Sequence, residues 1–162
     1  MKPKVLIVAG SDSDLPVVEE AQRMLKDFGV PYQVTIASAH RSPELVDELA
    51  SGAEEDGFEV VIAAAGMAAH LAGAIAARTA LPVIGVPLSA SSLGGIESLL
   101  SMAQMPSGVP VATMAIGKAG ARNAALFAVR ILARKDSQLQ RKLHDHRKKM
   151  ASDVKGLRAP AI

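Results

Sequence analysis

The chain has 162 residues, 49% of them hydrophobic and only 2% aromatic, which predicts a single domain over residues 1–162 with a core of small aliphatic side chains. It contains no cysteine, which excludes a disulfide framework and a cysteine-ligated metal site, and its formal net charge is +2. No apolar run has the length of a membrane span or the flanks of a signal peptide, so we expect a cytoplasmic protein.

Apolar runs alternate with amphipathic segments along the chain. Five short apolar runs predict buried strands over residues 4–10, 32–38, 58–66, 82–88 and 109–116. Five amphipathic segments predict helices over residues 14–29, 42–57, 67–80, 94–108 and 121–135. In the second of these helices Ser42 is a candidate N-cap. The inward-facing residues of that helix are expected to be Leu45, Val46, Leu49 and Ala53.

A polar, basic helix is predicted to begin at about Ser137. More than half of the lysines and arginines follow Val129. A basic segment can bind nucleic acid or an acidic partner, but no aromatic side chains interleave here to stack on bases. We therefore expect residues 137–162 to form a basic helix and tail that serves as an assembly arm, and we expect neither a nucleic acid nor a membrane as partner.

The predicted strands are apolar throughout instead of alternating between apolar and polar residues. Such strands are buried on both faces, which is typical of parallel sheets covered by helices on each side. The helical connections between them are expected to be right-handed. The pattern therefore predicts an α/β fold, a three-layer α/β/α sandwich with a doubly wound parallel sheet of about five strands, of the flavodoxin-like type.

Polar residues follow the predicted strands at the point where each strand ends. Ligands of such sheets bind outside the carboxyl ends of the strands, so these residues are expected to converge on one cleft. The segments in question, in chain order, are residues 11–14, 38–42, 66–70, 89–92 and 117–120.

An anion site is predicted at the first of these segments. Ser11 and Ser13 lie at a strand-to-helix turn, where free backbone N–H groups and the helix dipole favour an anion. Arg41 is placed to add a bidentate contact to a phosphate. Asp14 repels a phosphate and suits a sugar hydroxyl better. The alternative is that Ser13 and Asp14 are only helix caps.

Two histidines are candidates for proton transfer in the same cleft. Histidine is the side chain whose ordinary pKa, about 6.5, lies nearest neutrality, and His40 and His70 both follow strands. They can move a proton without a metal or cofactor, although for His70 a structural role is an equally good interpretation. His144 and His146 lie two residues apart on a helix and so point to different faces, which does not suit a metal site.

Several nucleotide-binding and hydrolase motifs are absent. The chain has no Gly-x-Gly-x-x-Gly after its first strand, no Walker loop around GKAG and no Gly-x-Ser-x-Gly elbow. A phosphate-accepting receiver domain needs an aspartate after the third strand, where this chain has Ala-Ala-Gly. A non-catalytic nucleotide-binding module of this fold stays open as an alternative.

The chain resembles the PurE family, in its bacterial type, from about Val5 to Leu132. The resemblance rests on GSDSD, SAHRSP and AAHLAG after the first three strands, and on LPVIGVP, MPSGVPVAT and IGKAGARNAAL further on. It implies a cofactor-free enzyme of purine biosynthesis that isomerises N5-carboxyaminoimidazole ribonucleotide to 4-carboxy-5-aminoimidazole ribonucleotide. Direct carboxylation of aminoimidazole ribonucleotide by carbon dioxide is the alternative reaction. The family's assemblies imply a homo-octamer.

The resemblance also implies roles for individual residues. Ser11, Ser13 and Arg41 hold the phosphate, Asp14 holds the ribose, and His40 is the general acid and base. His70 and Gly66 border the place where the carboxylate travels. The rest of the pocket is expected to be formed by Ser38, Ala39, Ala68 and Ala69.

The segment around His70 departs from the family pattern. Family members typically read Gly-Gly-Ala-Ala-His-Leu-Pro-Gly, whereas this chain reads GMAAHLAG, with Met67 in place of a glycine and Ala72 in place of a proline. A methionine adds bulk at that position, and strain if the backbone there has a positive φ. We therefore expect the carboxylate end of the pocket to have a shape of its own in this chain.

Overall fold

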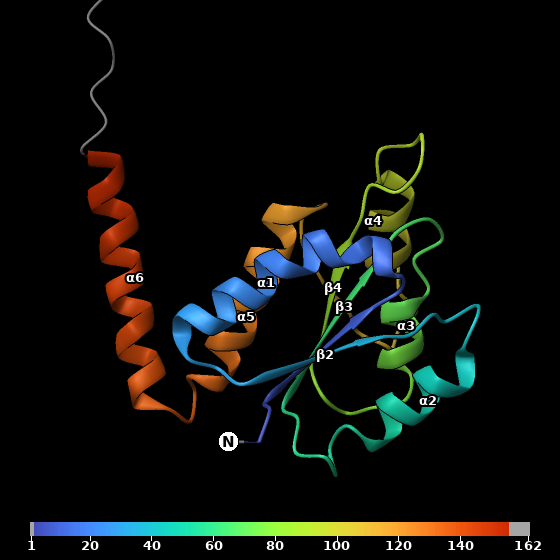
Figure 1. The fold of residues 1–162 in the computed structure, drawn as a ribbon, viewed down its shortest axis with the longest axis horizontal. Helices are drawn as coiled ribbons and strands as arrows, with labels where there is room; N and C mark the ends of the chain where they lie inside the picture. The colour runs from blue at the N-terminus through green and yellow to red at the C-terminus, as the bar shows by residue number, and fades with distance from the viewer. Residues whose placement is uncertain (1, 156–162) are drawn as a thin grey trace, which may run out of the picture.

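A computed structural model describes residues 2–155 and has a five-stranded parallel sheet at its centre (Figure 1). The strands are β1 (Val5–Ala9), β2 (Tyr32–Ile36), β3 (Val60–Ala65), β4 (Val83–Pro87) and β5 (Ala112–Thr113). Their order in the sheet is β2-β1-β3-β4-β5, and every pairing is parallel. This is the flavodoxin-like order, so the predicted fold class is confirmed.

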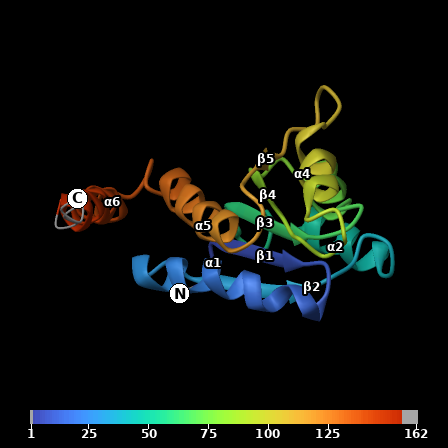
Figure 2. The same cartoon turned by 90° about the horizontal axis from the view of Figure 1, so that it is seen from above.

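Helices cover both faces of the sheet, as Figure 2 shows from above. The layer on one face consists of α1 (Leu15–Phe28) and α5 (Lys118–Leu132), and that on the other of α2 (Pro43–Gly52), α3 (Leu71–Ala76) and α4 (Ile96–Ala103). Alternate residues of β1 supply the two cores, because successive side chains of a strand point to opposite faces. Ile7 packs with α1 and α5, whereas Leu6 and Val8 pack with α2 and α3.

Several elements differ from the sequence-based expectation at their ends. β2 is an edge strand and is only partly buried, because no neighbouring strand covers its outer side. α2 ends at Gly52 instead of residue 57, and Leu45, expected inward, is 38% exposed. The Ser42 hydroxyl does not cap α2; it donates to the Ser38 carbonyl and accepts from the Ser38 N–H. β5 has two residues instead of eight, and α5 begins at Lys118.

The basic helix expected near residue 137 is present as α6 (Ser137–Lys155). Figures 1 and 2 both show it at the side of the molecule, away from the sheet. None of its residues is buried. It is attached through the end of α1, where Lys142 Nζ donates to the Phe28 carbonyl at 2.7 Å and the ring of His146 meets that of Phe28 edge to face. Residues 156–162, the tail of the predicted assembly arm, lie outside the described residues.

Among residues 2–155, no helix combines the length and the apolar character that crossing a lipid bilayer requires.

Candidate active site

A cavity of about 430 Å³ lies at the carboxyl ends of β1, β2 and β3. This is the switch point of the sheet, because the chain leaves β1 toward β2 on one side and returns to β3 on the other. Ten of the eleven predicted site residues line it: Ser11, Ser13, Asp14, Ser38, Ala39, His40, Arg41, Gly66, Ala69 and His70. Ala68 does not, and it is exposed in the turn before α3.

The sequence analysis missed two small residues of the cavity wall, Gly10 and Ala65, at the ends of β1 and β3. Ala90, from the segment after β4 that was expected at this edge, also lines the cavity. Glycine and alanine carry no reactive group, so only their position after a buried strand could have pointed to them. The polar segment after β5 lines no part of this cavity, although it was expected at the same edge.

His40 and His70 both line the cavity and contact each other, although they are 30 residues apart in the chain. His40 Nε2 lies 2.6 Å from His70 Nδ1, and the ring centroids are 4.8 Å apart with 62° between the ring planes. One of these two nitrogens must donate and the other accept, so a single proton lies between them. The pair can therefore pass a proton from one ring to the other, which suits general acid and base chemistry.

Arg41 is held beside the turn that follows β1. Its Nη2 donates to the Gly10 carbonyl at 3.1 Å, and its backbone N–H donates to Ser38 Oγ at 3.2 Å. A guanidinium has five N–H donors in a planar fork, so these contacts leave donors for an anion. Arg41, from the segment after β2, lines the same cavity as Ser11 and Ser13, which come from the segment after β1. The sequence analysis expected these three residues to lie together.

Ser11, Asp12 and Ser13 form a local hydrogen-bonded turn, η1 (Asp12–Asp14) being a single turn of 3₁₀ helix. Asp12 Oδ1 accepts from Ser11 Oγ at 2.9 Å and from the Ser13 N–H at 3.0 Å. These two hydrogen bonds lower the pKa of the Asp12 carboxyl. The Ser13 hydroxyl donates to Ser11 Oγ at 3.1 Å. The Ser11 hydroxyl and the Ser13 N–H therefore already donate to a carboxylate, and an anion bound at this turn would compete with Asp12 for them.

Asp14 is buried at the same wall, only 7% exposed. It occupies the N-cap position of α1, but its carboxylate makes no capping hydrogen bond, so the helix-cap interpretation of Asp14 is wrong. Burial raises the pKa of Asp14, which means that folding disfavours its ionised form. The cost to folding appears as the pH rises through the titration of this carboxyl and is fully present above it. Because the ionised form of Asp14 lowers the stability of the fold, we explain its presence at this wall by ligand binding and not by stability.

The segment from Gly66 to His70 is a tight turn and not the first turn of the helix predicted over residues 67–80. Met67 and Ala69 have φ of 56° and 49°, which a helix does not allow, and α3 begins only at Leu71. A Cβ on Gly66 would lie 2.5 Å from the Cβ of Ala90, so only glycine fits there. The turn directs the chain so that His70 meets His40.

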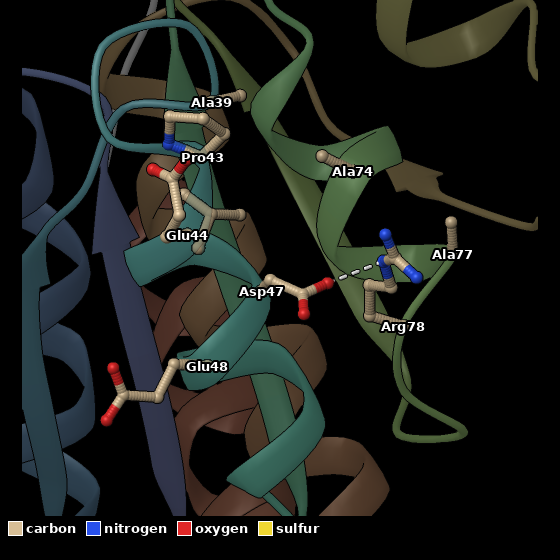
Figure 3. Close-up of a pocket in the computed structure, with 9 residues that line it drawn as sticks. Ala39, Pro43, Glu44, Asp47, Glu48, Ala74, Ala77 and Arg78 are labelled. Atoms are coloured by element: carbon tan, nitrogen blue, oxygen red, sulfur yellow. Dashed lines mark ion pairs between the residues drawn. The ribbon is translucent and has the colours of Figure 1, made fainter.

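A second hollow, of about 650 Å³, lies between α2 and α3 (Figure 3). Three of its side chains are carboxylates, those of Glu44, Asp47 and Glu48, and Asp47 pairs with Arg78 at 2.7 Å. An excess of negative charge repels a phosphate. We therefore place the candidate active site in the smaller cavity, which holds Arg41 and both histidines.

Within residues 2–155, no three histidine, aspartate or glutamate side chains lie close enough together to form a metal site.

Comparisons with known proteins show relatives that match nearly the whole chain. A family model described as AIR carboxylase matches residues 4–153. The chain is 58% identical over 153 residues to a Pyrococcus horikoshii protein named N5-carboxyaminoimidazole ribonucleotide mutase, covering 94% of this chain and 85% of that protein. It is 52% identical over 154 residues to a phosphoribosylaminoimidazole carboxylase of Saccharomyces cerevisiae, covering 95% of this chain but only 27% of that protein.

A solved structure shares the fold over almost the whole chain. The crystal structure of Treponema denticola PurE2-S38D superposes with a TM-score of 0.85 at 28% identity, covering 95% of this chain and 94% of that one. The chain belongs to the AIR carboxylase family.

Proposed function

We propose that the chain is an N5-carboxyaminoimidazole ribonucleotide mutase of purine biosynthesis and that His40 is its proton shuttle. The mutase name belongs to the relatives whose length this chain nearly matches, such as those of Pyrococcus horikoshii and Escherichia coli. The carboxylase of Saccharomyces cerevisiae is a much longer protein, so the direct carboxylation of aminoimidazole ribonucleotide is not favoured. The observation that carries the proposal is the His40–His70 pair in the cavity that also holds Arg41.

The ribonucleotide is anchored at the wall formed by the ends of β1 and β2. Ser11, Ser13 and Arg41 hold its phosphate, since their donors already gather around a carboxylate and a carbonyl in the free protein. Asp14 accepts a hydrogen bond from a ribose hydroxyl, since an ionised carboxylate at this wall offers acceptors and no donor. This places the aminoimidazole ring toward the two histidines at the other end of the cavity.

The reaction needs one proton to be given and one to be taken back. His40, as imidazolium, protonates the carbamate nitrogen of the substrate; the bond from that nitrogen to the carboxyl carbon then breaks, its electron pair stays on nitrogen, and carbon dioxide is released. Carbon 4 of the imidazole attacks the carbon dioxide, which forms the new carbon–carbon bond and a carboxylate. The proton still on carbon 4 passes to His40, so atoms and charge balance and the imidazolium is restored.

Retention of carbon dioxide matters as much as proton transfer. A released molecule that stays beside the ring reacts without a second-order encounter, and a wall that excludes water limits its loss. Ala39, Gly66, Ala69 and Leu71 line this end of the cavity with small or aliphatic groups. The carboxylate therefore travels between nitrogen and carbon along a wall that offers it few competing hydrogen bonds.

We further propose that the chain assembles into a homo-octamer and that α6 is its assembly arm. No residue of α6 is buried in the single chain, although Met150 and Val154 place apolar surface on one side of it. We expect light scattering to give the mass of an octamer for the unchanged protein and a smaller mass for Met150→Glu combined with Val154→Glu. An unchanged octamer in that double variant would contradict the role given to α6.

The mutase proposal is tested by following the carbon dioxide during turnover. We expect the purified chain to convert unlabelled N5-carboxyaminoimidazole ribonucleotide without ATP, and to place little label in the product when isotopically labelled bicarbonate and carbonic anhydrase are present. A direct carboxylase would instead consume aminoimidazole ribonucleotide readily and fill the product with label. Tight binding of the ribonucleotide without any turnover would favour a non-catalytic binding module.

A further inference from the structure

The turn before His70 holds two residues in an unusual backbone conformation. Met67 and Ala69, with φ of 56° and 49°, are the two non-glycine residues with positive φ among residues 2–155. The left-handed region is unfavourable for any residue with a Cβ, and such outliers gather at functional sites, where the surrounding structure maintains them. Both lie within three residues of His70, so the strain is concentrated beside the histidine pair.

The strained turn is fixed to the neighbouring strand and helix. Ser98, a fully buried residue of α4, has its hydroxyl 3.1 Å from the Met67 carbonyl and 3.1 Å from the Leu88 carbonyl. The Ala69 N–H donates to the Gly66 carbonyl at 3.0 Å, which closes the turn. These contacts fix the backbone position of Met67 relative to the end of β4, so the surrounding structure maintains its left-handed conformation.

Met67 carries the one large, exposed apolar side chain among the described residues that line the cavity. It is 57% exposed, whereas Leu71, the other large aliphatic residue of the wall, is buried. The remaining apolar lining residues are alanines. A methionine side chain is unbranched and flexible, so it can follow the outline of a bound ring. Its apolar surface offers neither a hydrogen bond to water nor one to carbon dioxide.

We propose that Met67 is a positioning residue that closes the cavity over the reacting end of the substrate and retains the released carbon dioxide there. This role rests on the mutase function proposed above. The chain accepts an unfavourable backbone at Met67 because that conformation brings a large apolar side chain to the rim beside His40 and His70. Ser98 serves this role indirectly, by holding the Met67 carbonyl.

Three substitutions separate the side chain from the backbone strain. Met67→Ala removes the side chain and keeps the strain, Met67→Gly removes both, and Met67→Leu keeps both. Each variant is given unlabelled N5-carboxyaminoimidazole ribonucleotide in the presence of labelled bicarbonate and carbonic anhydrase. We expect the alanine and glycine variants to form product in which the labelled fraction is several times that found with the unchanged protein. We expect the leucine variant to stay close to the unchanged protein. The matched control is Leu100→Ala, which truncates a 51% exposed apolar residue outside the cavity.

The measured label fraction and the unfolding midpoint distinguish this role from a structural one. A residue that only supported the fold would lower activity and the unfolding midpoint without raising the label fraction. If the unchanged protein interconverts the two ribonucleotides and the alanine and glycine variants incorporate as little label as it does, the retaining role of Met67 is wrong. Absence of interconversion in the unchanged protein would refute the mutase function itself, and this role with it.

Discussion

Replacing His40 by asparagine is expected to reduce the interconversion of the two ribonucleotides by about 10²–10⁴-fold, the contribution typical of a general acid or base. Asparagine has nearly the shape of the imidazole stem and keeps a donor and an acceptor, but it cannot take up and return a proton at neutral pH. Binding of the ribonucleotide is expected to change little, because the phosphate and ribose are held by Ser11, Ser13, Asp14 and Arg41 at the other end of the cavity. Turnover and calorimetric binding, measured on the same preparation, check both parts.

The control for this variant is His144→Asn. His144 is an exposed histidine of α6 and lines no part of the cavity, so its replacement is expected to leave turnover unchanged. A His40→Asn protein that binds substrate normally and also turns it over at a near-normal rate would contradict the proton-shuttle role. In that case the imidazole of His70, 2.6 Å away in the free protein, would be the group to test next.

The second large effect is expected for Arg41→Met, which keeps the length of the side chain and removes its charge. We expect KM for the ribonucleotide to rise by about 30-fold or more, since losing one partner of a charge-assisted contact costs about 2–5 kcal/mol. The effect on kcat is expected to be much smaller, because Arg41 contacts the Gly10 and Ser38 side of the cavity and not the histidine pair. Steady-state kinetics give both constants.

A substrate analogue without the phosphate shows whether Arg41 acts on that group. The unchanged protein and Arg41→Met are expected to bind this analogue equally weakly, because the contact that distinguishes them is absent. Arg23→Met is the matched control, since Arg23 is an exposed residue of α1 that pairs with Glu19 and Glu20 away from the cavity. If Arg41→Met weakens the analogue as much as the ribonucleotide, the arginine does not serve the phosphate.

Much of the fold can be predicted from the sequence because its strands are continuous apolar runs. β1 and β3 are buried at every position, and this is the property that indicates a parallel sheet between two helical layers. The expectation fails for β2, which lies at the edge of the sheet and is only partly buried. Its sequence, YQVTI, contains the polar residues Gln33 and Thr35, and this alternation is typical of a partly exposed strand.

The place of the candidate site can be predicted from the parallel sheet, but the full conformation of the turn before His70 cannot. Parallel strands bring their carboxyl ends to one edge, so the polar segments after all five strands were expected to meet. Those after β1, β2 and β3 do, whereas only Ala90 of the segment after β4 and no residue of the segment after β5 line the cavity. Ala68 was expected in the wall as a small apolar residue beside Ala69, and it does not line the cavity. The left-handed residues on either side of it, Met67 and Ala69, change the direction of the chain. The glycine that the family has at position 67 pointed to a positive φ for Met67, but nothing in the sequence indicated one for Ala69.

The most direct test of the account is a crystal structure of the full chain with 4-carboxy-5-aminoimidazole ribonucleotide. We expect the phosphate within hydrogen-bond distance of Ser11, Ser13 and Arg41, and the imidazole ring of the ligand beside His40. A ribonucleotide found instead in the acidic hollow between α2 and α3, with His40 and His70 free of it, would contradict the account.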